Sequence, residues 1–123
     1  MMVQADLLLV SPYWRTRAYL RAQLKEEGVA VVAFSSISDA RSWVKASGHI
    51  PRVVLVDLWR QIVRDRDLEW LRSGSSSPVV FFLLGASEAA PRNLERIGRV
   101  VRRPVSVGEL VERLKRAVAE AAA

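Results

Sequence analysis

The stretch Val53-Val54-Leu55-Val56-Asp57 decides the fold that this sequence predicts. Four consecutive apolar residues, three of them valine, are typical of a strand that is covered on both faces. A carboxylate stands directly at the C-terminal end of this run. We therefore interpret residues 53–56 as a strand of a parallel sheet that places Asp57 at its carboxyl end.

Similar apolar runs lie on both sides of this stretch, and segments with helical periodicity separate them. The sequence contains no internal repeat, no low-complexity tract and no long linker. The predicted strands are Leu7–Val10, Val29–Phe34, Val53–Val56, Val79–Leu84 and Val100–Val101. Five strand–helix units in a chain of this length predict one domain over residues 1–123, a doubly wound α/β fold with helices on both faces of a parallel sheet.

The intervening segments carry start and stop signals for helices. Ser11 and Pro12 read as an N-cap followed by proline at the first helical position, and Gly28 is expected to end that helix. Ser38 is expected to cap a second helix that ends at Gly48. The remaining signals are a helix around Leu68–Leu71 before a turn at 73–77, a helix from Pro91 to Gly98, and a capping box of Ser106 and Glu109 that opens the last helix.

The composition excludes several classes of site. The chain has 123 residues, of which 50% are hydrophobic and 26% charged, as in an ordinary globular domain. It has no cysteine, which excludes disulfides and a cysteine nucleophile, and His49 is its only histidine. We interpret His49 as an exposed loop residue. No glycine-rich nucleotide loop and no G-x-S-x-G motif occurs in the sequence.

Signals for export and for membrane insertion are also missing from the sequence. No apolar run approaches the ~20 residues that span a bilayer. Residues 1–6 lack the basic stretch of a signal peptide. We therefore expect a cytoplasmic protein without a membrane partner.

Ligands of doubly wound sheets bind at the carboxyl ends of the strands. In this sequence that rule brings together Ser11, Asp57, the Leu84-Gly85 end of the fourth strand, and Arg102-Arg103. We expect these residues to surround one crevice.

Several segments match the pattern of one known family in order and in spacing. They are Arg17, Leu20, Leu24 and Gly28 in the first helix, Asp57 after its strand, the helix at 68–72, Pro78-Val79-Val80, and Arg103-Pro104. Together they resemble the receiver domains of two-component response regulators, and the resemblance covers essentially the whole chain. It implies a flavodoxin-like three-layer fold with strand order 2-1-3-4-5, no enzymatic activity, and a role in phosphorelay signal transduction by protein–protein interaction.

The resemblance also implies a chemistry for the crevice. In the family, an acidic pair after the first strand and an aspartate after the third gather Mg²⁺ on oxygen ligands. That aspartate accepts a phosphoryl group, whose charge the metal and a lysine of the fifth strand neutralise. A threonine or serine of the fourth strand and an aromatic residue of the fifth then move. Asp57 occupies the phosphoacceptor position.

This sequence departs from the family at the residues that carry that chemistry. Ser11 and Pro12 replace the acidic pair, and Leu83 replaces the threonine or serine. Arg103, which precedes Pro104, replaces the lysine and presents a wide planar fork instead of a compact ammonium. Two further departures are Val100 in place of the aromatic residue and Gln61 in place of a proline.

These departures predict that Asp57 binds Mg²⁺ weakly or not at all, because one carboxylate rarely suffices beside a cationic side chain. We interpret the chain as an atypical pseudo-receiver without a cofactor. In this interpretation Asp57 and Arg103 form a partly buried ion pair that holds the crevice in one state. The alternative is a receiver that a dedicated kinase still phosphorylates on Asp57.

Arginines crowd into the predicted fourth helix and fifth strand, and the chain carries a formal net charge of +6. They are Arg92, Arg96, Arg99, Arg102 and Arg103. The resemblance implies that this edge, with the last helix, binds another signalling protein or a second copy of the chain. A module for nucleic acid or for an acidic partner is the alternative, and nucleic acid is disfavoured because no recognition motif accompanies the charge. Glu88, Glu95, Glu109 and Glu112 are the expected counterions.

Four tryptophans are many for a chain of this size. Trp43 and Trp70 fall on helical faces and are expected in the core. Trp14 and Trp59 are expected beside the crevice, where they either pack locally or anchor a partner. An enzyme on the same fold is a further alternative, which no paired nucleophile and base supports.

Overall fold

The computed structural model describes residues 4–59, 63–72, 78–90 and 94–122. Their strands form one parallel sheet in the order β2-β1-β3-β4-β5. The strands are β1 (Leu7–Val10), β2 (Val31–Phe34), β3 (Val53–Asp57), β4 (Val79–Leu84) and β5 (Arg99–Arg102). This is the predicted doubly wound fold, with the predicted strand order.

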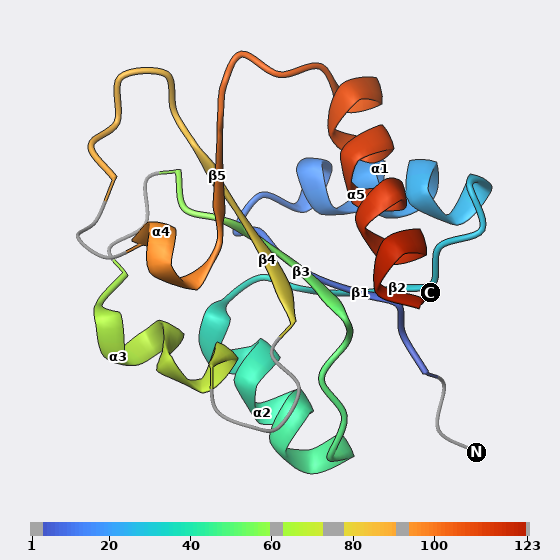
Figure 1. Cartoon of the computed structure of the whole chain (residues 1–123), viewed down its shortest axis with the longest axis horizontal. Helices are drawn as coiled ribbons and strands as arrows, with labels where there is room; N and C mark the ends of the chain where they lie inside the picture. Colours follow the sequence, from blue (N-terminus) through green and yellow to red (C-terminus); the bar gives the residue numbers. More distant parts are fainter. Residues whose placement is uncertain (1–3, 60–62, 73–77, 91–93, 123) are drawn as a thin grey trace.

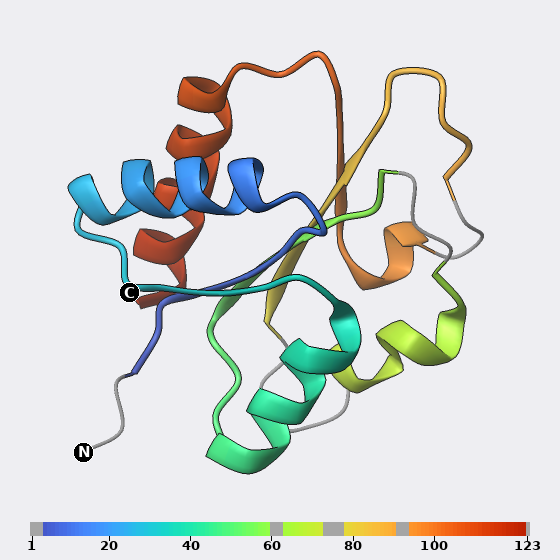
Figure 2. The same ribbon diagram turned by 180° about the vertical axis from the view of Figure 1, so that it is seen from behind.

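Helices cover both faces of the sheet (Figures 1 and 2). α1 (Trp14–Glu26) and α5 (Val107–Ala122) lie on one face. The other face carries α2 (Ile37–Ser47), α3 (Asp65–Leu68) with the 3₁₀ turn η1 (Glu69–Leu71), and α4 (Leu94–Ile97). No helix in the described ranges is long and apolar enough to cross a bilayer.

The sheet separates two hydrophobic cores because successive side chains of a strand point to opposite faces. In β3, Val53 and Leu55 face α1 and α5, whereas Val54 and Val56 face α2, α3 and α4. The continuous apolar runs of the sequence are therefore needed, since every position of β1 and β3 is buried on one side of the sheet or the other.

The register of the sheet determines what surrounds Asp57. Val10 pairs with Val56, so Ser11 follows β1 at the level of Asp57, and Leu83 of β4 pairs with Asp57 directly. Leu83 belongs to the core beneath α1 and α5. The alternation of side chains places Ser11, Asp57 and Leu83 on this same face.

Two of the predicted helix starts are wrong. α1 begins at Trp14, and its N-cap residue Tyr13 makes no side-chain capping bond, because the Ser11 hydroxyl is used at the end of the sheet instead. Ser36, not Ser38, caps α2 and accepts a hydrogen bond from the Asp39 amide at 3.1 Å. Three other signals are confirmed: Gly28 and Gly48, both in the left-handed region, follow α1 and α2, and Ser106 caps α5 through the Glu109 amide.

The side of the molecule around His49 also differs from the prediction. His49 is half-buried rather than exposed, and its ring packs edge-on against Trp43 with 6.3 Å between centroids. Its Nε2 lies 3.3 Å from the Ala5 carbonyl oxygen. Trp43 and Trp70 both pack against the core beneath α2, as predicted.

A surface ion pair joins the two helices of the α1–α5 layer. Lys115 of α5 donates a hydrogen bond to Glu27 at 2.9 Å. This bond and the charge of Glu27 raise the pKa of Lys115 above the ordinary 10.5. A raised lysine pKa means that Lys115 keeps its charge at neutral pH, and that the contribution of the pair is lost only as the pH rises through that pKa.

Some predicted features lie outside the described residues. They are Gln61, the turn at 73–77, Pro91 as a helix start, and Arg92.

The close approach of Gly98 to β4 gives a test of the packing. A Cβ at Gly98 would overlap the backbone oxygen of Val80 and lie 2.9 Å from the Val80 Cβ. We expect Gly98→Ala to lower the free energy of unfolding by about 2 kcal/mol. Gly108→Ala, in the first turn of α5 with open space around it, is the control and is expected to be neutral or stabilising by about 0.5 kcal/mol. Urea unfolding that finds the two variants equally stable would contradict the close contact between Gly98 and β4.

Candidate functional site

Asp57 is buried at the carboxyl end of β3, with 1% of its surface exposed. The hydroxyl of Ser11, itself fully buried, donates to Asp57 Oδ2 at 3.1 Å. The same hydroxyl accepts a hydrogen bond from the Tyr13 amide at 3.3 Å. Ser11 therefore acts both as a donor to the carboxylate and as the organiser of the turn that leads from β1 into α1.

Arg103 binds the same carboxylate through both of its terminal nitrogens. Nη1 lies 3.4 Å from Asp57 Oδ1 and Nη2 lies 3.3 Å from Oδ2. The Trp59 amide donates to Oδ1 at 3.1 Å. The predicted ion pair is thus present and is partly buried, since the Arg103 side chain retains 29% of its exposure. Such a pair stabilises only when the remaining lone pairs are hydrogen-bonded, and the Ser11 and Trp59 bonds contribute here.

An aromatic stack covers the ion pair from the solvent side. The Arg103 guanidinium carbon lies 5.1 Å from the centroid of the Trp59 ring, within the range of a cation–π contact. The Tyr13 ring packs on Trp59 at 5.4 Å, and the Tyr13 hydroxyl donates to the Trp59 carbonyl oxygen at 3.4 Å. Of the two predicted roles of Trp59, local packing is therefore the one that the contacts support.

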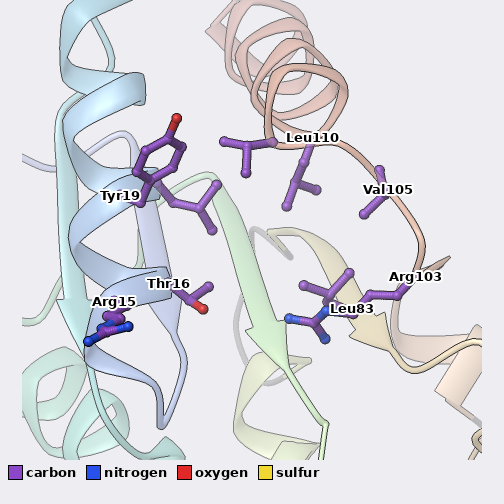
Figure 3. Close-up of a pocket in the computed structure, with 9 residues that line it drawn as sticks. Arg15, Thr16, Tyr19, Leu83, Arg103, Val105 and Leu110 are labelled. Carbon is purple, nitrogen blue, oxygen red and sulfur yellow. The ribbon is translucent and has the colours of Figure 1, made fainter.

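Leu83 lies under the ion pair, because β4 runs between β3 and β5 in the sheet. It is 2% exposed and faces the same side as Asp57. In Figure 3 the Arg103 side chain extends past Leu83 towards α1. An aliphatic side chain at this position offers no hydroxyl that could compete for the carboxylate or for the guanidinium.

The structure adds two residues that the sequence analysis did not place in the crevice, and removes one. Tyr13 faces Trp59, and Arg17 of α1 donates to the Ser11 carbonyl oxygen at 2.7 Å. Trp14 was expected beside the crevice, but it is 65% exposed and stacks with Arg15 on the outside of α1. Aromatic side chains in adjacent positions of a helix start point in different directions, and the sequence alone does not select between them.

The two prolines of the predicted site lie at its surface. Pro12 and Pro104 are both exposed, and the peptide bond between Arg103 and Pro104 is cis. Neither proline ring brings a polar side chain to Asp57.

The arginines of α4 and β5 lie on one exposed edge, but the contacts differ from the prediction. Arg102 donates to the carbonyl oxygens of Glu88 at 2.6 Å and Gly85 at 3.2 Å, so it binds backbone rather than a carboxylate in these two contacts. Arg99 stacks over Phe81 at 5.6 Å. Glu109, a predicted counterion of this edge, pairs within its own helix with Arg113 at 3.0 Å.

Solved structures of receiver domains match this chain over nearly its whole length. A response regulator receiver domain protein from Clostridium thermocellum matches with a TM-score of 0.71 and 18% identity, over 94% of this chain and 95% of that one. A CheY-like receiver domain protein from Methanospirillum hungatei JF-1 matches with a TM-score of 0.75 and 14% identity, over 95% and 96%. An adenylate cyclase from Rhodopirellula baltica matches with a TM-score of 0.75 and 17% identity, over 97% and 90%.

No protein-family model matches the sequence, and no curated protein resembles it significantly. The structural likeness nevertheless establishes the fold. The chain has the flavodoxin-like fold of response-regulator receiver domains, with Asp57 at the carboxyl end of the central strand.

The two partners of the ion pair differ in burial, so removing one or the other is expected to have unequal effects on stability. Arg103→Ala leaves a buried carboxylate without its cation, so we expect the free energy of unfolding to fall by about 3 kcal/mol. Asp57→Asn keeps the shape of the buried side chain, and the partly exposed Arg103 guanidinium can be solvated by water. We therefore expect this variant to lower the free energy of unfolding by only about 1 kcal/mol.

We further expect the double variant Asp57→Asn/Arg103→Ala to be more stable than Arg103→Ala alone, because it no longer buries an unpaired negative charge. Urea unfolding is the measurement. Arg113→Ala, which breaks an exposed arginine–glutamate pair, is the control and is expected to cost less than about 0.5 kcal/mol. Additive effects of the two crevice substitutions would show that the pair carries no coupling energy.

Proposed function

We propose that this chain is a cytoplasmic, non-enzymatic signalling module of the receiver fold that works without phosphorylation of Asp57. In this proposal it regulates a partner by protein–protein contact from a crevice fixed in one state. The observation that carries the proposal is the set of donors on Asp57. Ser11, Trp59 and Arg103 all direct N–H or O–H groups at the carboxylate.

The donor set suits a fixed ion pair better than a magnesium site. Mg²⁺ prefers an octahedron of oxygen ligands with one or two carboxylates. Next to Asp57 stand the neutral hydroxyl of Ser11 and the guanidinium of Arg103, and the nearby Trp59 carbonyl oxygen accepts from Tyr13. To bind Asp57, a divalent cation would have to take the place of the Arg103 guanidinium on the carboxylate. The displaced guanidinium would stay close by, and the repulsion between the two positive charges opposes metal binding.

The strand positions that would respond to a phosphoryl group carry aliphatic side chains. The neighbouring position of β4 is Leu83, whose side chain makes no hydrogen bond. The aromatic position of β5 is the half-buried Val100. A weak metal site and an aliphatic residue on β4 supply neither strong transition-state stabilisation nor a conformational switch.

The partner surface that we propose is the exposed edge formed by α4, β5 and α5. Arg96 and Arg99 are exposed there, whereas Arg102 is held by carbonyl oxygens of the preceding loop. Exposed guanidinium groups along one edge favour an acidic protein surface through electrostatic complementarity.

Incubation with acetyl phosphate and MgCl₂, followed by intact-mass measurement, tests the chemical part of the proposal. We expect the wild-type chain to keep its mass. An increase of about 80 Da that Asp57→Asn abolishes would show that Asp57 is still a phosphoacceptor and would overturn the proposal.

A second experiment restores the carboxylate and the lysine that the receiver pattern has at positions 11 and 103. Ser11→Asp combined with Arg103→Lys places a second carboxylate beside Asp57 and removes the planar fork. We expect Mg²⁺ to stabilise this variant, by about 1.4 kcal/mol at roughly ten times its Kd, and not the wild type. Thermal unfolding with and without MgCl₂ is the measurement, and equal stabilisation of both proteins would contradict the assigned roles of Ser11 and Arg103.

Charge reversal tests the partner surface. Quantitative affinity enrichment with the wild type, Asp57→Asn and Arg96→Glu/Arg99→Glu as baits is expected to give a shared partner for the first two and loss of that partner for the third. Arg41→Glu/Lys45→Glu, with the same charge change on exposed positions of α2, is the control. Retention by the α4–β5 variant, or enrichment of nucleic acid alone, would reject this surface as a protein-binding site.

A further inference from the structure

A cavity of about 330 Å³ lies between α1, α5 and the loop that joins β5 to α5. Figure 3 shows the side chains that line it. Buried leucines from three elements, Leu20, Leu83 and Leu110, form its apolar interior. Val105 and Val107 add an apolar wall on the loop side. The cavity thus has the apolar interior and the size, at the lower limit, of small-molecule sites.

The polar side chains that line the cavity are positive or neutral. Arg103 enters it from the loop, whereas Arg15 contributes to the lining from α1 with its guanidinium turned outward onto the Trp14 ring. Thr16 and Tyr19 add hydroxyl groups, and no acidic side chain is among the described residues of its lining. A pocket with an apolar interior and the single guanidinium group of Arg103 is complementary to an apolar molecule with one anionic end.

Exposed hydrophobic side chains gather around the same cavity. The large hydrophobic residues that are exposed in the described chain are Trp14, Tyr19 and Val107. Tyr19 and Val107 line the cavity directly. Beyond Tyr19, the exposed positions of α1 include Arg21 and Lys25 and no further large apolar residue. The apolar surface is therefore a local recess and not the long stripe that a docked helix requires.

We propose that this cavity binds a small amphipathic carboxylic acid of medium chain length. Its aliphatic body would occupy the space above Leu83 and Leu110, and its carboxylate would face the guanidinium group of Arg103. A guanidinium group donates two parallel hydrogen bonds to a carboxylate. A ligand that carries an ammonium group in place of the carboxylate cannot accept these bonds.

Binding in this cavity is linked to Asp57 through Arg103. The guanidinium that faces the cavity is the one that holds Asp57, with N···O distances of 3.3 and 3.4 Å. A ligand carboxylate and Asp57 therefore share a single cation. The site stands on its own lining and does not require that the proposed partner binding or the loss of phosphorylation be correct.

Titration of the ¹⁵N-labelled chain with sodium octanoate tests the proposal. We expect saturable amide shifts at the start of α5, in the second turn of α1 and at the end of β4, with a Kd of about 1 mM, as for a ligand of this size. Octylammonium and acetate, which lack the anionic end and the apolar body respectively, are expected to bind at least about tenfold more weakly.

Substitutions at exposed positions locate the site without disturbing the core. Val107→Asp places a negative charge on the cavity wall, where the start of α5 tolerates it. We expect it to weaken octanoate binding at least about tenfold, while Val107→Thr retains binding within about threefold. Arg15→Gln, which removes an outward-facing guanidinium, and Arg21→Gln, on the same helix outside the cavity, are the controls and are expected to retain binding within about threefold.

The octanoate affinity of the Asp57→Asn variant tests whether Asp57 and the ligand carboxylate share the Arg103 guanidinium. Because this change removes the anion that competes for Arg103, octanoate is expected to bind several-fold more tightly. An unchanged or weaker affinity would overturn the linkage. Shifts that do not saturate, that map elsewhere, that octylammonium reproduces, or that Val107→Asp leaves intact would overturn the site itself.

Discussion

The contact between the Asp57 carboxylate and the Arg103 guanidinium joins the ends of β3 and β5 across β4. A carboxylate that is 1% exposed is costly unless a cation and further donors compensate its charge. The neighbouring residues supply this compensation: Ser11 and the Trp59 amide donate, while the Trp59 ring covers the guanidinium. Leu83 completes the arrangement by keeping other polar groups away from the pair.

In the function that we propose, the residues that build this network stand at the positions where the receiver pattern has the groups that bind a metal and a phosphoryl group. Ser11 donates where a carboxylate would coordinate, and Arg103 fills space that a compact ammonium would leave open. The sheet and its two cores do not depend on these positions. In this proposal the receiver fold is kept while the chemistry at the ends of its strands is replaced. The fold alone does not define the function.

Much of the fold was predictable from sequence because each strand is a continuous apolar run, and β1 and β4 have the predicted bounds. Register then explains why Ser11, Asp57 and Leu83 meet. The ion pair was predictable because a buried carboxylate needs a cation and Arg103 stands at the end of the fifth strand.

Competition between local and tertiary contacts made other features unpredictable. A serine before proline signals a helix cap, but in this chain the Ser11 hydroxyl is buried against Asp57 and donates to it. The choice between Tyr13 and Trp14 as the residue that covers the crevice depends on the angle at which α1 leaves the sheet. The cavity between α1 and α5 combines residues from three distant segments, and no local pattern marks it.

A crystal structure grown with MgCl₂ and beryllium fluoride tests the central claim most directly, because these additives mimic the metal-bound phosphoryl state. The account predicts that Arg103 still contacts both carboxylate oxygens of Asp57, with Ser11 and the Trp59 amide as the other donors. A magnesium ion coordinated by Asp57 together with oxygen ligands from the end of β1, and Arg103 displaced from the carboxylate, would contradict it.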